Sequence, residues 1–394
     1  MLYKKRVSRS RDECVPSVIK STTQTLRSVQ AMDRLILAEP LLFFLLATVF
    51  FYLAIQQPKS SLKRRVLGSF HVLSIAVSFQ ADPVVLSFYP GITIPFVVGL
   101  TVHTVAILLF SGHVLDLRSL ALSQQARTFV RAWTSIRQLH LADHVDTPDA
   151  ATMSARRASF ALHRAVQGLL LWVAHHAIAV LFPLALLRLN VQPGDFAPEK
   201  QGIVPVLTQH DLLLRALVST HWVWDTYCTL SIWHDALAVV CVAILGWDRP
   251  SEWPPLFGSV LEAHSLRRFW GVFWQRLHVT PFSSWTPPLV YRVAALRALW
   301  IFLLSAMCHA AVNWAMYRIH TVREDVWFFL VNYTLCLAET AAPAVLRRMG
   351  LTSFGKGSIP GRTVRLLGYL WVIVFFVCTV PGWQYPLVYN SLRM

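Results

Sequence analysis

Charged residues are scarce in this chain of 394 residues: Asp, Glu, Lys and Arg together make up 14%, whereas soluble domains carry about a quarter. Hydrophobic residues make up 55% of the chain. So little charge cannot cover the surface of a soluble fold that contains so much apolar side chain. The composition therefore excludes an ordinary soluble domain and predicts a membrane protein.

Several motifs of soluble enzymes are also missing. The chain has no Gly-rich phosphate loop, no His-Glu-x-x-His and no Gly-x-Ser-x-Gly, so the chemistries that depend on these motifs lose their sequence support. Its six cysteines form no Cys-x-x-Cys pair, and five lie in apolar surroundings. This pattern predicts neither a disulfide framework nor a zinc site. We therefore expect no metal and no permanently bound cofactor.

Long apolar stretches recur along the chain. A helix needs roughly 20 mostly apolar residues to cross the hydrocarbon layer of a membrane. We predict an all-α fold, a polytopic transmembrane bundle with interfacial amphipathic helices, one of them within 111–165. Residues 1–34 are predicted to form a polar tail and 35–394 the transmembrane domain. About eight spans are expected, near 35–56, 66–86, 91–110, 166–187, 226–247, 289–316, 326–346 and 366–387.

The basic residues behind the net charge of +16 lie mostly between these stretches. No basic-aromatic module of a nucleic-acid binder accompanies them. One set of alternate loops contains 20 Lys and Arg and the other set contains 6, which predicts that the richer set faces the cytosol. Eight further basic residues precede the first stretch. They disagree with an even number of spans, so the side of the N-terminus is left open.

One histidine lies deep within an apolar stretch. His309 belongs to 289–316, and in a helix Ser305 and Asn313 lie one turn before and one turn after it. An ionisable side chain in a span is costly and indicates function. A neutral imidazole in a low dielectric can accept a proton near neutral pH, which suits a general base, and Ser305 and Asn313 are predicted to fix its tautomer. The alternative is a histidine that hydrogen-bonds a neighbouring helix.

The segment before this stretch combines aromatic and basic residues. It contains Trp-Pro-Pro-Leu-Phe-Gly from Trp253 and Ser-Leu-Arg-Arg-Phe-Trp-Gly-x-x-Trp from Ser265. Apolar residues at four-residue steps over 261–277 predict an interfacial amphipathic helix, with Trp253, Trp270 and Trp274 as anchors at the headgroups. Guanidinium groups match phosphate geometry. The predicted binding set for a nucleotide-bearing acyl donor is Arg267, Arg268, Trp270, Trp274 and Arg276; the alternative is that these arginines contact lipid headgroups.

A second polar pair lies within the 226–247 stretch. His234 and Asp235 are adjacent there, and a charge in a span must face the bundle interior. The pair is a candidate to bind substrate or to support His309, with a purely structural ion pair as the alternative. Asp325 and Glu339 raise the same question. Four further histidines in apolar stretches lack a metal-like partner spacing and are predicted to form hydrogen bonds in the core or between helices: His71, His103, His175 and His176.

Taken in order, these two motifs and the downstream His309 resemble the wax-synthase-like branch of the membrane-bound O-acyltransferases, in particular fungal members that acetylate terpenoid and meroterpenoid hydroxyls. The matching motifs cover residues 248 to 313. The resemblance implies acyl transfer from acyl-CoA to an alcohol, with His309 as the base. Many relatives have a histidine directly after the second Trp, where this chain has Gln275. His278, three positions later, is the candidate to replace it.

The resemblance also implies a cellular setting and partners. It indicates an acetyltransferase of fungal secondary metabolism in the endoplasmic reticulum membrane, with acetyl-CoA as co-substrate and a hydrophobic alcohol as acceptor. Two alternatives are left open: fatty-acyl transfer to a long-chain alcohol or sterol, and a non-enzymatic transporter. Paired broken spans and repeat symmetry, which would support a transporter, are not found in the sequence.

Overall fold

The computed structural model describes residues 41–78, 90–110, 117, 119–134, 150–203, 208–348 and 361–393. Within these ranges the chain forms helices and loops and no strand, which confirms the predicted all-α class. The predicted polar tail, 1–34, lies outside the described residues.

A helix overlaps each of the predicted spans. Four of these helices are long and apolar enough to cross a membrane: α5, α6 with its π-helical extension η4 (Val240–Ile244), α10 and α12. By length and composition they identify a membrane protein, whereas eight complete spans are not confirmed. The overlapping helices are Leu41–Ile55, α2 (Leu62–Ser78), α3 (Pro90–Leu109), α5 (Ala150–Arg188), α6 (Gln209–Val239), α10 (Ala294–Tyr317), α11 (Val322–Arg348) and α12 (Gly361–Ser391).

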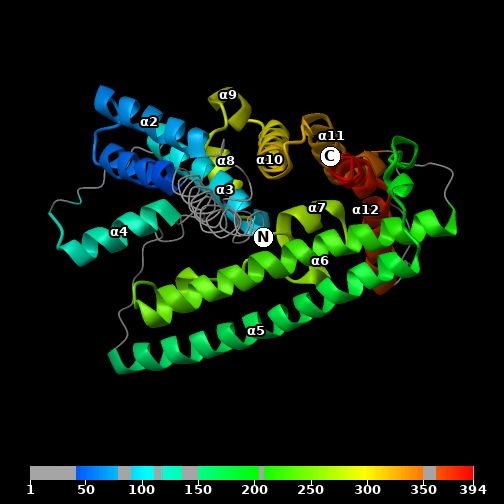
Figure 1. Ribbon diagram of the computed structural model, residues 1–394, viewed down its shortest axis with the longest axis horizontal. Coiled ribbons are helices and arrows are strands. Elements are labelled where there is room, and N and C mark those ends of the chain that lie inside the picture. The colour runs from blue at the N-terminus through cyan, green and yellow to red at the C-terminus, as the bar shows by residue number, and fades with distance from the viewer. Residues whose placement is uncertain are drawn as a thin grey trace, which may run out of the picture.

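The helices pack as a bundle around a short central segment. Figure 1 shows α5 and α6 as a long antiparallel pair along one side, with α12 crossing one end of α6. On the other side α10 packs against α11 and against α3. Two short elements, α7 (Leu266–Arg268) and α8 (Val279–Ser284), fill the space between these helices, and α7 contacts α11 while α8 contacts α3 and α10.

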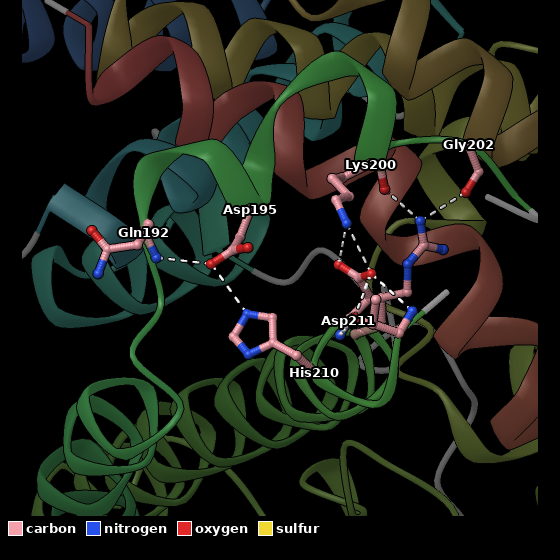
Figure 2. Close-up of polar contacts among 8 residues, drawn as sticks. Gln192, Asp195, Lys200, Gly202, His210 and Asp211 are labelled. Carbon is pink, nitrogen blue, oxygen red and sulfur yellow. Dashed lines mark hydrogen bonds and ion pairs between the residues drawn. The ribbon is translucent and has the colours of Figure 1, made fainter. Parts of the chain in front are cut away.

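The loop before α6 is tied to the start of that helix by polar contacts (Figure 2). Thr208 caps the helix, its hydroxyl accepting the Asp211 N–H at 3.2 Å. The Asp211 carboxylate lies 2.8 and 2.9 Å from the ammonium of Lys200. His210 Nε2 lies 3.1 Å from Asp195 Oδ2. These contacts fix the connection between α5 and α6.

The largest hydrophobic core contains the aromatic motif segment. Leu256, Phe257, Phe269, Phe273 and Trp274 are buried there against residues of α10, α11 and α12. The segment is not one amphipathic helix: α7 continues into the π-helical η7 (Phe269–Phe273) and then ends. The prediction of one helix over 261–277 is therefore wrong, and Phe269 and Phe273 of its apolar stripe face the protein core, whereas Leu261 is exposed.

Gly258 shows how tightly this segment is folded. Its N–H donates to the Phe273 carbonyl at 2.8 Å, and a Cβ at this position would lie 2.2 Å from the carbonyl oxygen of Val272. Only glycine, which has no Cβ, allows these two stretches of backbone to approach this closely.

The predicted amphipathic helix of the 111–165 region is present as α4 (Leu122–Thr134). Two of its arginines contact other parts of the protein: Arg131 lies 2.7 Å from Asp248 and 2.6 Å from Glu252, and Arg127 donates to the Trp247 carbonyl. Its position at the membrane interface stays a prediction.

Candidate active site

His309 lies on α10 with aromatic rings from two other helices against it. Its imidazole centroid is 5.2 Å from the ring of Phe329 on α11 and 5.5 Å from the ring of Trp383 on α12. Both aromatic residues are buried, whereas His309 itself is exposed. The imidazole is thus held by protein rings and still accessible to a reactant.

His278, immediately before α8, lies against α3. A Cβ at Gly99 of α3 would be 2.7 Å from His278 Cε1, and the His278 ring stacks on Phe282 at 5.5 Å. Burial, and after it the positive charges that His309 and His103 can carry, lowers the pKa of His278 to about 4. Because α8 packs against α10, the structure brings the two predicted histidines into one region.

The His278 imidazole has unused hydrogen-bonding capacity. Its Nδ1 is buried and makes no hydrogen bond to the described part of the chain. His71 differs in this respect, because its two ring nitrogens contact Ala47 O and Thr104 Oγ1 at 2.8 Å each. His103 Nε2 lies 3.0 Å from the Ala132 carbonyl. The prediction of core hydrogen bonds is confirmed for His71 and His103, whereas it is wrong for His176, which is exposed and contacts the Trp172 carbonyl of its own helix at 2.8 Å.

Asn313 does not pair with His309. Its amide donates to Thr321 Oγ1 at 2.9 Å and to Asp325 Oδ2 at 3.4 Å, and no hydrogen bond joins it to His309 in the described residues. The prediction that Asn313 fixes the His309 tautomer is therefore wrong. Asp325 also accepts the indole N–H of Trp383 at 2.7 Å. The carboxylate that contacts Asn313 therefore also holds the Trp383 ring, which lies next to His309.

The predicted donor-binding arginines differ in their surroundings. Arg267 and Arg276 are exposed, and Arg268 pairs with Glu262. The backbone N–H groups of Leu266 and Arg267 donate to the carboxylate of Glu339 at 3.0 and 2.9 Å. Glu339 thus caps α7, a structural use of this intramembrane acid.

The predicted headgroup anchors are core residues instead. Trp274 is 6% exposed and stacks on Phe269 at 5.1 Å. Trp270 donates its indole N–H to the buried Asn332 at 2.8 Å. The anchoring prediction for Trp270 and Trp274 is therefore wrong, and their part in donor binding stays a prediction.

Asp235 is paired with a partner that was not predicted. Its Oδ1 lies 2.9 Å from Arg164 Nη1 and 3.6 Å from His234 Nδ1. Arg164, on α5, also donates to the Trp253 carbonyl at 2.8 Å. The ion pair links α5, α6 and the start of the aromatic motif. This agrees with the alternative of a purely structural ion pair for His234 and Asp235. Substrate binding by this pair stays a prediction.

The sequence did not single out Arg164, Phe329 or Trp383 as parts of the site. Arg164 is one of several arginines before α5 becomes apolar, and the two aromatic residues lie in stretches where aromatic side chains are common. Only the tertiary contacts distinguish them.

Residues 253–331 match the sequence model of the membrane bound O-acyl transferase family. They contain both histidines and the aromatic motif. No solved structure matches the chain.

Curated relatives match a larger part of the chain. It is 31% identical over 181 residues to acetyltransferase TRI7 of Fusarium sporotrichioides, covering 42% of this chain and 40% of that protein. It is 29% identical over 171 residues to acetyltransferase ataH of Aspergillus terreus (40% and 54%), and 26% identical over 227 residues to acetyltransferase eriL of Hericium erinaceus (55% and 56%). The chain thus spans about half the length of the curated relatives it matches. These matches confirm, over residues 253–331, the resemblance to the membrane-bound O-acyltransferases and to the fungal acetyltransferases among them.

Proposed function

We propose that this protein is an integral-membrane O-acyltransferase that transfers acetyl from acetyl-CoA to a hydroxyl of a lipophilic alcohol. One observation carries the proposal: inside the family-matched segment, an accessible imidazole, His309, lies on an apolar helix in the same region as a second histidine, His278. Acyl transfer to a hydroxyl needs a group that removes the hydroxyl proton as the oxygen attacks.

In the proposed reaction His309 accepts the proton of the acceptor hydroxyl while its oxygen attacks the thioester carbonyl of acetyl-CoA. The tetrahedral intermediate then collapses, the carbon–sulfur bond breaks, and the leaving thiolate takes the proton from the imidazolium. The oxyanion requires a hydrogen-bond donor that is already in place. His278, kept neutral by burial, has one N–H and a buried Nδ1 without a partner in the described residues, so it is the candidate donor.

The substrates follow from the surroundings of the two histidines. The exposed Arg267 and Arg276 are the cations available to the phosphates of the acyl donor. The rings of Phe329 and Trp383 beside His309 favour an apolar acceptor. The relatives are called acetyltransferases and come from fungi, which supports acetyl transfer to a terpenoid or meroterpenoid in secondary metabolism, in a multi-pass protein of the endoplasmic reticulum.

A transporter is less well supported, because two carboxylates that could line a polar path through the bundle already have partners in the protein. Asp235 pairs with Arg164, and Glu339 accepts two backbone N–H groups and the Trp371 indole. Both carboxylates therefore already have structural partners in the protein.

The test uses microsomes that contain the protein, labelled acetyl-CoA or palmitoyl-CoA, and a panel of terpenoid, sterol and long-chain alcohols. His309→Ala should lower acetyl transfer by roughly 100-fold or more, the contribution typical of a general base. The matched control is His176→Ala, an exposed histidine on α5 that contacts the Trp172 carbonyl of its own helix, and it should keep wild-type activity. Equal turnover by His309→Ala would remove His309 from the reaction. A clear preference for palmitoyl-CoA would replace acetyl transfer with the fatty-acyl alternative.

A further inference from the structure

Trp383 is the α12 residue that contacts His309, and its own position is closely determined. The two rings meet edge to face, with an interplanar angle of 80°. The Trp383 ring stacks on Phe328 at 4.3 Å and 12° and meets Trp222 edge to face at 5.2 Å. Trp383 is 3% exposed. Neighbouring rings therefore restrict the tilt of the indole, and its rotation in the plane depends on its N–H.

Asp325 determines that rotation. Its Oδ1 accepts the Trp383 indole N–H at 2.7 Å, and its Oδ2 accepts the Thr321 hydroxyl at 2.6 Å and the Asn313 amide at 3.4 Å. Asp325 is fully buried, and no Lys or Arg of the described chain forms an ion pair with it. A buried carboxylate is costly unless hydrogen bonds satisfy it. These three donors provide that compensation.

The three donors come from different parts of the bundle around His309. Asn313 is one turn after His309 on α10, Thr321 directly precedes α11, and Trp383 is on α12. One carboxylate on α11 therefore connects the helix of the proposed base to the helix that supplies its aromatic neighbour. A shift of α12 relative to α10 would have to break at least one of these bonds.

We propose that Asp325 is a positioning residue for the proposed acyl transfer: it holds the Trp383 indole against the His309 imidazole. The inference rests on the proposed function. A ring held edge to face at 5.5 Å restricts the imidazole to one orientation.

The first test compares Asp325→Ala, Asp325→Asn and Trp383→Phe with the wild type. Asp325→Ala leaves the indole N–H without an acceptor, and we expect kcat to fall about 10- to 100-fold with little change in KM for acetyl-CoA, as for a small misplacement of a reacting group. Asp325→Asn keeps an acceptor oxygen and should recover most of the activity. Trp383→Phe removes the same hydrogen bond from the other side. The double variant Asp325→Ala/Trp383→Phe should then be no worse than either single variant, because one interaction cannot be lost twice.

The matched control is Thr379→Val, one turn before Trp383 on α12. Thr379 is buried, and its hydroxyl bonds the Phe375 carbonyl of its own helix at 2.8 Å. It should keep activity near the wild-type value. If Thr379→Val lost as much activity as Asp325→Ala, or if Asp325→Ala kept the wild-type kcat, the positioning role would be overturned. Additive losses in the double variant would also overturn it.

A second readout does not depend on turnover. Carbethoxylation of individual histidines by diethyl pyrocarbonate, followed by mass spectrometry of the peptides, reports the accessibility of His309 directly. Loosening of the Trp383 ring should raise the His309 rate several-fold in Asp325→Ala and leave the His176 rate unchanged. An unchanged His309 rate would refute the inference. A wild-type protein without turnover on any acceptor would refute the proposed function, while the His309 rate would still decide the positioning role.

Discussion

Replacing Arg164 by methionine should destabilise the bundle more than the loss of an exposed ion pair. Arg164 is 5% exposed and Asp235 is 2% exposed, and their charged atoms lie 2.9 Å apart. Asp235 Oδ2 is buried without a hydrogen-bond partner in the described chain. With the guanidinium gone, the ion pair that the carboxylate keeps in the described chain is the 3.6 Å contact with His234 Nδ1. The variant therefore leaves a buried charge almost without compensation.

The expected loss follows from this burial. Removing one partner of a buried ion pair costs about 3–5 kcal/mol, and Arg164→Met also removes the bond to the Trp253 carbonyl. The reference is Arg268→Met, because the side chains of Arg268 and Glu262 are 34% and 37% exposed. Exposed pairs contribute about 0–1 kcal/mol. The difference between the two variants should thus be at least about 2 kcal/mol.

The measurement is equilibrium unfolding in mixed micelles, with the denaturing detergent fraction raised stepwise and helicity followed by circular dichroism. The double variant Arg164→Met/Asp235→Leu removes both charges and should regain most of the lost stability, since apolar replacements of buried pairs are often neutral. Two results would refute the reasoning. One is a free energy of unfolding of Arg164→Met within about 1 kcal/mol of the wild-type value. The other is a double variant that loses as much stability as Arg164→Met and Asp235→Leu lose together when each is measured alone.

The same double variant examines the predicted substrate role of Asp235. A folded double variant with normal acetyl transfer would leave Asp235 with a structural role alone. A folded double variant whose KM for the acceptor rises sharply would assign the carboxylate to substrate binding.

Two further predictions concern the aromatic segment and its histidine. Gly258→Ala places a methyl group against the Val272 carbonyl oxygen and should destabilise strongly or prevent folding, whereas Gly271→Ala, with nothing within 4 Å of its new methyl, should not; equal thermal stability of the two variants would contradict this. His278 has a folded pKa of about 4 against 6.5 when unfolded. Its neutral form is thus favoured by folding, so the contribution to stability is complete above pH 6.5 and declines as the pH falls toward 4, by up to about 3 kcal/mol. The stability of the wild type relative to His278→Gln should therefore fall as the pH falls through that window, and a difference that does not change with pH would exclude the effect.

The sequence predicted the positions of the helices because long apolar runs need only local information. It could not predict what each apolar face contacts. The stripe that contains Phe269 and Phe273 has the spacing of an interfacial helix, yet both residues are buried in the core. Periodicity alone does not distinguish lipid from protein as the apolar partner. The same limit applies to Trp274, because a tryptophan beside arginines has the pattern of a headgroup anchor whether it contacts lipid or protein.

The candidate site was predictable only in part for a related reason. His309 stands out because a histidine within an apolar run is rare and costly. Its neighbours do not stand out, since Asp325 and Trp383 are 58 positions apart in the chain and meet only when α11 packs against α12. Arg164 and Asp235, which are 71 positions apart, are joined in the same way by the packing of α5 against α6.

Further contacts connect the aromatic motif to the surroundings of His309. Glu339 of α11 caps α7 through two backbone N–H groups, and Asn332 of the same helix accepts the Trp270 indole N–H. The motif is therefore attached to α11, the helix whose Phe329 and Asp325 determine the surroundings of His309. Its aromatic residues hold α11 in place, whereas Arg267 and Arg276 are exposed and remain the proposed contacts of the charged donor. Truncation of Asn332 should consequently affect the site through α11 rather than through the donor phosphates, because Asn332 is buried and bonds the Trp270 indole N–H and the Phe328 carbonyl of its own helix.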